Sequence, residues 1–185
     1  MRIVGGQWAG LPLTSPGPRI RPTMEAARVV AMDLLAPHLT GARFLDCFAG
    51  TGAVGLEALS RGAARCDFVE DGTAAAHGLK ANVAKVRARE RIRVFFRDAI
   101  PFVERLAPGA YDIAFIDPPY GSRKLERVLD SWCTNQFSNL LLIEHAADHP
   151  VTVPPGLRWK SRQVEDTVMT LIRARASEAT PSTPA

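Results

Sequence analysis

Four consecutive residues, Asp117-Pro118-Pro119-Tyr120, have types and an order that suit the handling of a planar amine. They follow an apolar run, residues 111–116, that is typical of a buried strand. Two prolines make a rigid loop with few free N–H groups, so the Asp117 carboxylate and the Pro118 carbonyl remain as acceptors that can face one point. The exocyclic amine of a base offers two N–H donors to that pair, and Tyr120 offers its ring for stacking. The tetrapeptide therefore predicts a site where a base amine is positioned to attack a methyl group.

Glycines at the spacing Gly-x-Gly-x-x-Gly indicate a second site, at Gly50, Gly52 and Gly55. An apolar run from residue 44 precedes them and a helical pattern through residue 61 follows. Glycine adopts positive φ and has no Cβ to keep a ligand from the backbone, and the first N–H groups of the following helix point toward the ligand. Taken alone, this spacing fits a dinucleotide fold, an S-adenosylmethionine (SAM) fold or a tight strand-to-helix turn.

Acidic residues follow four predicted strands in succession, at the edge where open α/β sheets bind ligands. They are Asp46, Glu70 with Asp71, Asp98 and Asp117. Glu70 lies 20 residues after Gly50, where a carboxylate can accept hydrogen bonds from the ribose hydroxyls of an adenosine. Asp98 suits either the adenine amino group or the N-cap of a helix that begins at Ala99. We expect one site at this edge of the sheet.

The elements that must position these residues follow from an alternation of strand-like and helical segments. A strand is predicted to begin at residue 44 and to have Asp46 at its end. Further strands are predicted at residues 65–70, 92–97, 111–116 and 139–144, helices at 73–86, 100–106 and 123–133, and a closing antiparallel hairpin at 157–163 and 167–173. Such alternation favours an α/β fold with a mostly parallel seven-stranded sheet and helices on both faces.

The first forty residues are predicted to form a small β-hairpin and a helix. Residues 2–7 and 11–14 are the two hairpin strands. Thr23 is the predicted N-cap of a helix that ends near Leu39. Domain bounds follow: an N-terminal extension over 1–22, one domain over 23–175, and a disordered tail of Ala, Ser, Thr and Pro with one Glu over 176–185.

Two groups of basic residues fit either a solvated surface or a nucleic-acid contact. Arg19, Arg21 and Arg28 bracket the start of the first helix, where they can form a phosphate-binding face. Residues 80–97 hold seven basic side chains and one acid, a pattern more typical of a solvated face.

Composition restricts the class of protein. The chain has 185 residues, a net charge of +4, and no apolar run near the ~20 residues of a membrane helix. The three cysteines are far apart, which predicts reduced thiols in a cytoplasmic protein and neither a disulfide nor a metal site. A monomer without membrane contact is the expectation.

The motifs resemble those of the SAM-dependent amino-methyltransferases, on Asp46-Cys47-Phe48-Ala49-Gly50-Thr51-Gly52, Glu70, Asp98 and Asp117-Pro118-Pro119-Tyr120. More narrowly, the chain is similar to the RsmD-type bacterial enzymes that methylate a guanine N2 in small-subunit (16S) ribosomal RNA. The narrower match rests on Met1-Arg2-Ile3-Val4-Gly5-Gly6-Gln7-Trp8-Ala9-Gly10, Arg21-Pro22-Thr23, Arg28 and the stretch from Asp46 through Gly62. Departures from that family occur at Met24-Glu25-Ala26-Ala27, Val29 and Asp71-Gly72.

The resemblance implies a Rossmann-like fold, SAM as cofactor, and 16S rRNA or the assembling small subunit as partner. The implied SAM contacts are Asp46, Phe48, Ala49, Gly50, Thr51, Gly52, Glu70, Asp71, Asp98 and Ala99. The implied catalytic residues are Asp117, Pro118, Pro119 and Tyr120. The implied RNA contacts are Arg19, Arg21, Thr23 and Arg28.

Three other functions remain open at this point. One is a related amino-methyltransferase that acts on another RNA, on DNA or on a protein glutamine. Another is an NAD-dependent dehydrogenase with the same glycine spacing, in which Pro118-Pro119 has no role. The last is an RNA-binding module without catalysis, which would tolerate the loss of Asp117.

Overall fold

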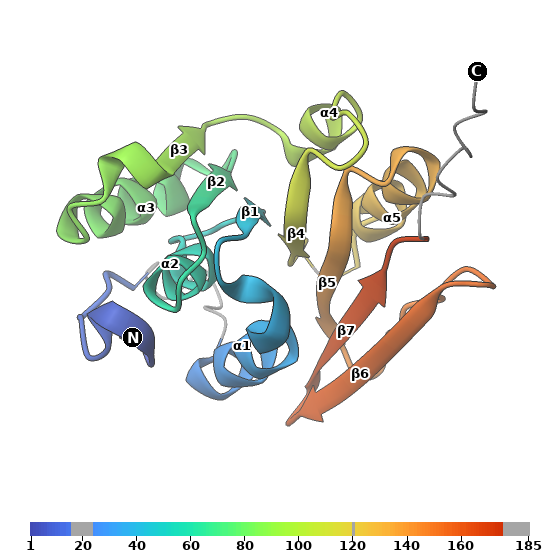
Figure 1. Ribbon diagram of the computed structural model, residues 1–185, viewed down its shortest axis with the longest axis horizontal. Coiled ribbons are helices and arrows are strands. Elements are labelled where there is room, and N and C mark those ends of the chain that lie inside the picture. Colours follow the sequence, from blue (N-terminus) through green and yellow to red (C-terminus); the bar gives the residue numbers. More distant parts are fainter. Residues whose placement is uncertain (16–23, 120, 176–185) are drawn as a thin grey trace, which may run out of the picture.

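The computed structural model describes residues 1–15, 24–119 and 121–175, and they form one seven-stranded sheet with helices on both faces (Figure 1). The strands are β1 (Arg43–Cys47), β2 (Arg65–Val69), β3 (Ile92–Phe95), β4 (Tyr111–Ile116), β5 (Ser138–Ala146), β6 (Arg158–Val164) and β7 (Thr167–Arg173). Their order is β3-β2-β1-β4-β5-β7-β6; the first five run parallel and β7 is antiparallel to both neighbours. The predicted fold class is confirmed.

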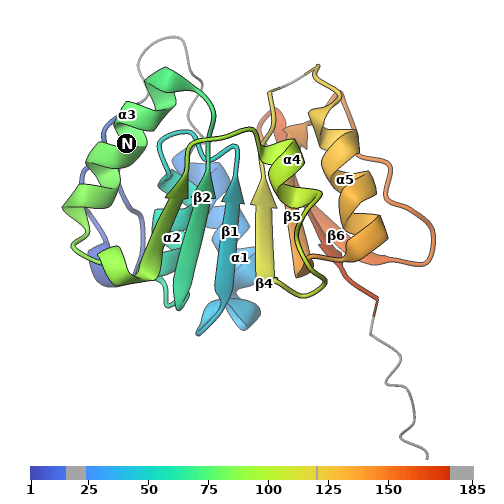
Figure 2. The same ribbon diagram turned by 90° about the horizontal axis from the view of Figure 1, so that it is seen from above.

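Successive residues of the central strands enter two separate cores, because side chains alternate across a sheet. Phe44 and Phe115 pack on one face, against α1 (Glu25–Leu39), α2 (Ala53–Ser60) and α3 (Thr73–Lys85). Leu45 and Ile116 pack on the other, against α4 (Ala99–Val103) and α5 (Lys124–Asn135). The view from above shows these layers, with the carboxyl ends of β1, β2 and β4 at one edge (Figure 2).

The predicted N-terminal hairpin is not confirmed. Residues 2 and 12 form one antiparallel bridge, and a 3-10 helix, η1 (Gly6–Trp8), replaces the end of the first predicted strand. The physical reason is the Glu57 carboxylate of α2, which accepts the amides of Val4 and Gly5 at 2.8 and 2.7 Å. Those amides are therefore unavailable to a partner strand, and the segment docks on α2 instead. Ile3 and Leu13 are buried in the same core as α1 and α2.

Helix α1 ends at Leu39 as predicted and begins at Glu25, with Met24 as its N-cap. The predicted cap Thr23, the arginines at 19 and 21, Tyr120 and the tail 176–185 lie outside the described residues. Within the described ranges, no helix combines the length and apolar character needed to cross a membrane. No His, Cys, Asp and Glu side chains in those ranges gather as a metal site.

Candidate active site

The glycine turn links β1 to α2 and leaves one side of its backbone open. Gly50 and Gly52 have φ values of +57° and +78°, and the Gly52 N–H donates to the Ala49 carbonyl at 2.7 Å. A Cβ on Gly52 would lie 2.5 Å from Leu79 Cδ1, so this glycine permits close packing against α3. Nothing lies within 4 Å of a Cβ position on Gly50. Gly50 therefore presents bare backbone to open space.

Glu70 holds the glycine turn from the neighbouring strand. Its Oε2 accepts the Gly50 N–H at 2.7 Å, and its Oε1 accepts the Gly72 N–H at 2.7 Å. Burial raises the pKa of this carboxyl, and the two amides oppose that rise. A carboxylate has about four acceptor sites in all, so Glu70 keeps acceptor capacity beyond these backbone amides. The geometry suits a group with two adjacent hydroxyls.

Asp46 lies beneath the turn, not at its surface. It is 1% exposed, and its Oδ2 accepts the Gly55 N–H in the first turn of α2 at 2.9 Å. Burial raises the pKa of this carboxyl well above its usual value, and the negative charges of Asp117 and Glu70 raise it further. Carboxylates at the ends of β1, β2 and β4 therefore act on one another. Asp46 caps α2 and fixes the direction of the glycine turn.

Lys124, which the sequence motifs did not single out, contacts both Phe48 and Asp71. Lys124, the first residue of α5, places Nζ 5.4 Å from the centre of the Phe48 ring and 3.7 Å from Asp71 Oδ2. Phe48 itself has φ of +59°, unusual for a residue with a Cβ. Lys124 follows the Asp-Pro-Pro loop by a few residues. This proximity in sequence is the feature that could have indicated its place near the site.

Asp98 and Ala99 lie after β3, at the start of α4. The Asp98 Oδ1 accepts the Ile100 N–H at 2.9 Å, so the predicted helix cap is present. The second carboxylate oxygen forms no hydrogen bond with a described residue, and the side chain is exposed. Ala99 is buried. Asp98 can therefore cap α4 and still accept a hydrogen bond from a ligand.

The Asp-Pro-Pro loop follows β4 at the same edge. Asp117 is half-buried, Pro118 is buried and Pro119 is exposed. The Pro119 carbonyl accepts the Ser122 N–H at 3.3 Å and the Ser122 hydroxyl at 2.6 Å, which closes a turn. No described residue donates to the Pro118 carbonyl. The loop thus places one carboxylate and one carbonyl acceptor after the strand, as its sequence predicts.

Arg28 corrects one expectation. Its side chain is fully buried, and Nη2 donates to the Arg2 carbonyl at 2.7 Å. Burial lowers the pKa of the guanidinium, and the charges of Glu57, Glu25 and Glu144 oppose this. Arg28 therefore joins α1 to the N-terminal segment and forms no part of an RNA-facing surface in this structure. Arginine is rarely buried, so sequence alone favours the wrong environment.

Asn82 was also missed, although it supports the glycine turn. This fully buried residue of α3 donates from Nδ2 to the carbonyls of Thr51 and Thr14, at 3.0 and 3.2 Å. Its Oδ1 accepts the Thr14 N–H at 2.7 Å. Thr51 is itself buried, so it serves the turn through its backbone. Nothing in the spacing of the sequence distinguishes Asn82 from a surface helix residue.

Comparisons with known proteins identify the family of the chain. Residues 1–173 match the family described as "Conserved hypothetical protein 95". The chain is 40% identical over 162 residues to ribosomal RNA small subunit methyltransferase D of Escherichia coli K12, covering 84% of this chain and 80% of that protein. It is 31% identical to the protein of the same name from Haemophilus influenzae, covering 83% of each.

A solved structure of the Escherichia coli protein yhhF superimposes with a TM-score of 0.81 at 31% identity, covering 94% of this chain and 97% of that one. The chain therefore belongs to the conserved hypothetical protein 95 family, that of the ribosomal RNA small subunit methyltransferase D proteins, and has their Rossmann-like methyltransferase fold.

Proposed function

We propose that this methyltransferase uses SAM to methylate the exocyclic N2 amine of a guanine in 16S ribosomal RNA. The observation that carries the proposal is the convergence of Asp46, Glu70 and Asp117, at the carboxyl ends of β1, β2 and β4, beside an open glycine turn. No described residue donates to the Pro118 carbonyl in the same loop. Relatives with the same fold carry the name ribosomal RNA small subunit methyltransferase D, which supports an rRNA substrate.

The residues at the glycine turn fit an adenosine-containing cofactor. Glu70 keeps acceptor capacity for the ribose hydroxyls, and Gly50 has bare backbone where a side chain would block approach. The Asp98 oxygen outside the helix cap can accept from the adenine amine, and the Phe48 ring can cover the site. When bound, SAM supplies a methyl group activated by a positively charged sulfur.

The Asp-Pro-Pro loop supplies the chemistry at the amine. The Asp117 carboxylate and the Pro118 carbonyl accept its two N–H groups, which localises the nitrogen lone pair. The nitrogen gains a methyl group and gives up one proton, for which Asp117 is the acceptor. Positioning and electrostatics then account for the catalysis, with no covalent enzyme intermediate. Tyr120, outside the described residues, remains the proposed stacking partner of the guanine.

Ribosomal RNA presents splayed bases in loops, which a stacking pocket of this kind requires. The proposal places the protein in the cytoplasm, acting as a monomer on 16S rRNA or the assembling small subunit. Arg19, Arg21 and Thr23 remain proposed RNA contacts.

The test replaces Asp117 by Ala and measures N2-methylguanosine in ribosomal RNA by nucleoside mass spectrometry. In cells that lack the gene, wild-type protein should restore the modified nucleoside and Asp117→Ala should not. SAM affinity of the variant, measured by calorimetry, should stay within a few fold of wild type. Asp130→Ala, which removes an exposed acid from α5, is the matched charge control and should retain activity. Restoration by Asp117→Ala would refute the proposed chemistry.

Glu70→Ala tests the cofactor site separately. The substitution removes both acceptor oxygens, so SAM binding should weaken by at least about tenfold, as expected for loss of a hydrogen bond to a charged group. An unchanged affinity in calorimetry would reject the ribose role of Glu70 and leave the role of Asp117 standing.

A further inference from the structure

The edge strand β6 carries a basic stripe, defined here as Arg158, Lys160 and Arg162. Alternate residues of a strand point to the same face, about 6.7 Å apart, so the three side chains form one row. In the register with β7, Lys160 lies opposite Leu171 and Arg162 opposite Met169. Both partners are buried in the core that contains α1 and α2. The basic stripe therefore lies on the α1 side of the sheet.

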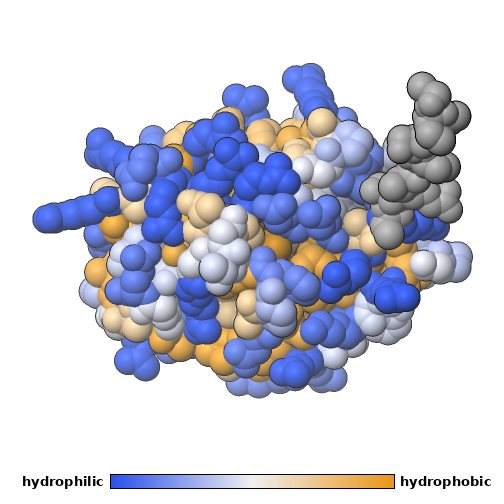
Figure 3. All heavy atoms as spheres, in the orientation of Figure 1, coloured by the Kyte–Doolittle hydropathy of each residue, from blue (hydrophilic) through white to orange (hydrophobic). Residues whose placement is uncertain are grey.

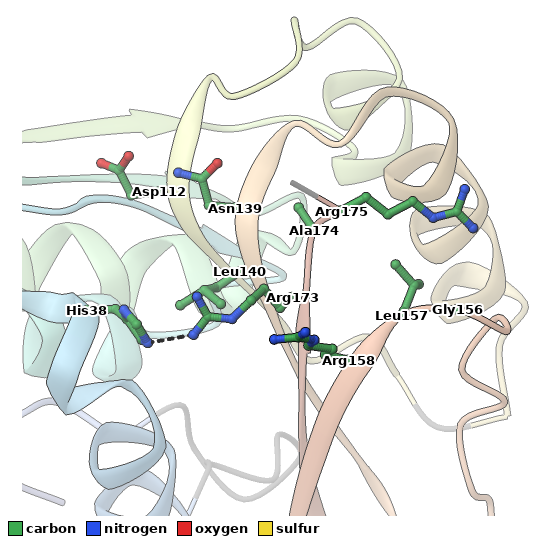
Figure 4. Close-up of a pocket in the computed structure, with 10 residues that line it drawn as sticks. All are labelled: His38, Asp112, Asn139, Leu140, Gly156, Leu157, Arg158, Arg173, Ala174 and Arg175. Atoms are coloured by element: carbon green, nitrogen blue, oxygen red, sulfur yellow. Dashed lines mark hydrogen bonds between the residues drawn. The ribbon is translucent and has the colours of Figure 1, made fainter. Parts of the chain in front are cut away.

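At the amino end of β6 the stripe meets a hollow of about 740 Å³. Figure 4 shows the side chains of Arg158, Arg173 and His38 gathered at this hollow, with Arg175 farther along its rim. Arg173 pairs with Arg158 across the strands, and its Nη2 donates to His38 Nε2 at 3.0 Å. An imidazole nitrogen that accepts a hydrogen bond carries no proton, so His38 is neutral here.

The cationic side chains of this region are not engaged in ion pairs with described residues. Arg158, Lys160, Arg162 and Arg173 are exposed, and none forms an ion pair with a residue in the described ranges. Asp112, which lines the far side of the hollow, is already held by the Arg43 guanidinium at 2.9 and 3.0 Å. Burial lowers the pKa of His38, and the charges of Arg173 and Lys160 lower it further.

The basic run at residues 80–97 is different, because several of its side chains bind the protein itself. Arg93 pairs with the buried Asp67, and Arg91 donates to three backbone carbonyls. Lys85 donates to the Pro12 carbonyl and the Thr14 hydroxyl. These side chains stabilise the fold, which leaves fewer charges for a partner than the count in the sequence suggests.

We propose that the basic stripe and Arg173 bind consecutive phosphates of the RNA strand whose guanine is methylated. The inference rests on the proposed function. The stripe runs from the hollow at Arg158 toward the carboxyl edge, because Val164 at its far end pairs with Thr167 beside Ala146, the last residue of β5. RNA seated on it is therefore led to the edge where Asp117 lies. In Figure 3, hydrophilic side chains run along the lower right rim, where Figure 1 draws β6.

Charged side chains on an edge strand also prevent strand-to-strand aggregation, and the experiment must separate that role from RNA binding. The test variant carries Arg158→Gln, Lys160→Gln and Arg162→Gln. The control carries Arg65→Gln, Arg105→Gln and Arg127→Gln, which removes three exposed arginines outside both basic groups and changes the net charge equally. Affinity for a fluorescein-labelled 16S rRNA stem-loop is measured by anisotropy over a salt series.

The stripe variant should bind the RNA at least about tenfold more weakly than wild type and the control. The slope of log affinity against log salt concentration should be smaller in magnitude by about 2, as expected for three lost phosphate contacts at ~0.7 each. A second variant, Arg158→Lys with Arg162→Lys, keeps the charge and should bind within about threefold of wild type. Affinity and slope equal to those of the control would overturn the proposal, as would a loss seen only with aggregation in size-exclusion chromatography.

Failure of this proposal is distinguishable from failure of the proposed reaction. Wild-type methylation of guanine N2, together with unchanged RNA affinity in the stripe variant, refutes the binding surface alone. RNA binding through the stripe without any N2-methylguanosine in cells refutes the reaction alone. SAM affinity should be the same in all variants, because the stripe is on a different strand from every proposed cofactor contact.

Discussion

Replacing Gly55 by Ala has two opposing effects on the free energy of unfolding, and the rough size of each is known. Alanine is favoured over glycine inside a helix by about 1 kcal/mol, which would stabilise α2. A Cβ at Gly55, however, would lie 2.4 Å from Phe68 Cε1 and 2.6 Å from Cys66 Sγ. Both neighbours are fully buried, so neither can move into solvent. Contacts this short force backbone shifts that cost about 1–3 kcal/mol, and two of them act here, so we expect the upper end of this range and a net loss of up to about 2 kcal/mol.

Urea unfolding, followed by tryptophan fluorescence, measures this loss as a lower midpoint with an unchanged slope. The control is Ala81→Gly on the exposed side of α3, where nothing but helix propensity changes and about 1 kcal/mol should be lost. Alanine is thus expected to be more stable than glycine at position 81 of α3 and less stable than glycine at position 55 of α2. Adding Phe68→Leu to Gly55→Ala should give a double variant more stable than the sum of the single changes predicts.

An unfolding midpoint for Gly55→Ala at or above that of wild type would refute the packing argument. It would mean that α2 moves away from β2 at little cost. The third glycine of the motif would then have no packing role, and the reason for its presence would have to be sought at the ligand.

Two further predictions concern buried polar groups. In Asp46→Asn the amide oxygen can still accept from Gly55, while the titratable carboxyl is gone. Because burial raises the pKa of Asp46 in the folded state well above its unfolded value, the wild-type protein loses stability as pH rises above the unfolded pKa. The variant should therefore gain stability relative to wild type as pH rises in urea titrations, and a pH-independent difference is the contrary result. Asn82→Ala leaves the Thr14 amide and the Thr51 carbonyl without a partner, so the free energy of unfolding should fall by about 2–4 kcal/mol in the same assay. SAM binding, measured by calorimetry, should also weaken. Wild-type values for both quantities would contradict the anchoring role of Asn82.

The sequence predicted the centre of the sheet well because β4 and β5 are apolar runs bounded by turn residues. β4 and β7 were predicted to the residue. β5 extends to Ala146, beyond the predicted residue 144, because its pairing with β7 continues that far. The N-terminal hairpin was not confirmed for a different reason. Residues 1–3 and 10–13 do pair across a turn, but the amides of Val4 and Gly5 donate to Glu57, which is distant in sequence.

For the candidate site, chain position was predictable and bonding partners were not. The acids at the strand ends gather as the topology requires, because parallel strands end at one edge. Whether a carboxylate such as Asp46 faces a ligand or caps a helix depends on a single amide, at Gly55, whose location appears only in the fold. Arg28 and Asn82 show the same limit, since the free energy of a buried polar side chain depends on partners that local sequence does not specify.

The bridge that Asn82 makes between Thr14 and Thr51 joins the start of the chain to the loop that would cradle the cofactor. Detachment of residues 1–14 and opening of that loop should therefore be coupled, because both break the hydrogen bonds of Asn82. Proteases cleave the N-terminal segment at a rate that follows the fraction of molecules in which the segment is detached. A ligand that binds the closed loop lowers that fraction, so cleavage should slow as the ligand site becomes saturated. The protease sensitivity of the first residues should therefore report whether the proposed cofactor site is occupied.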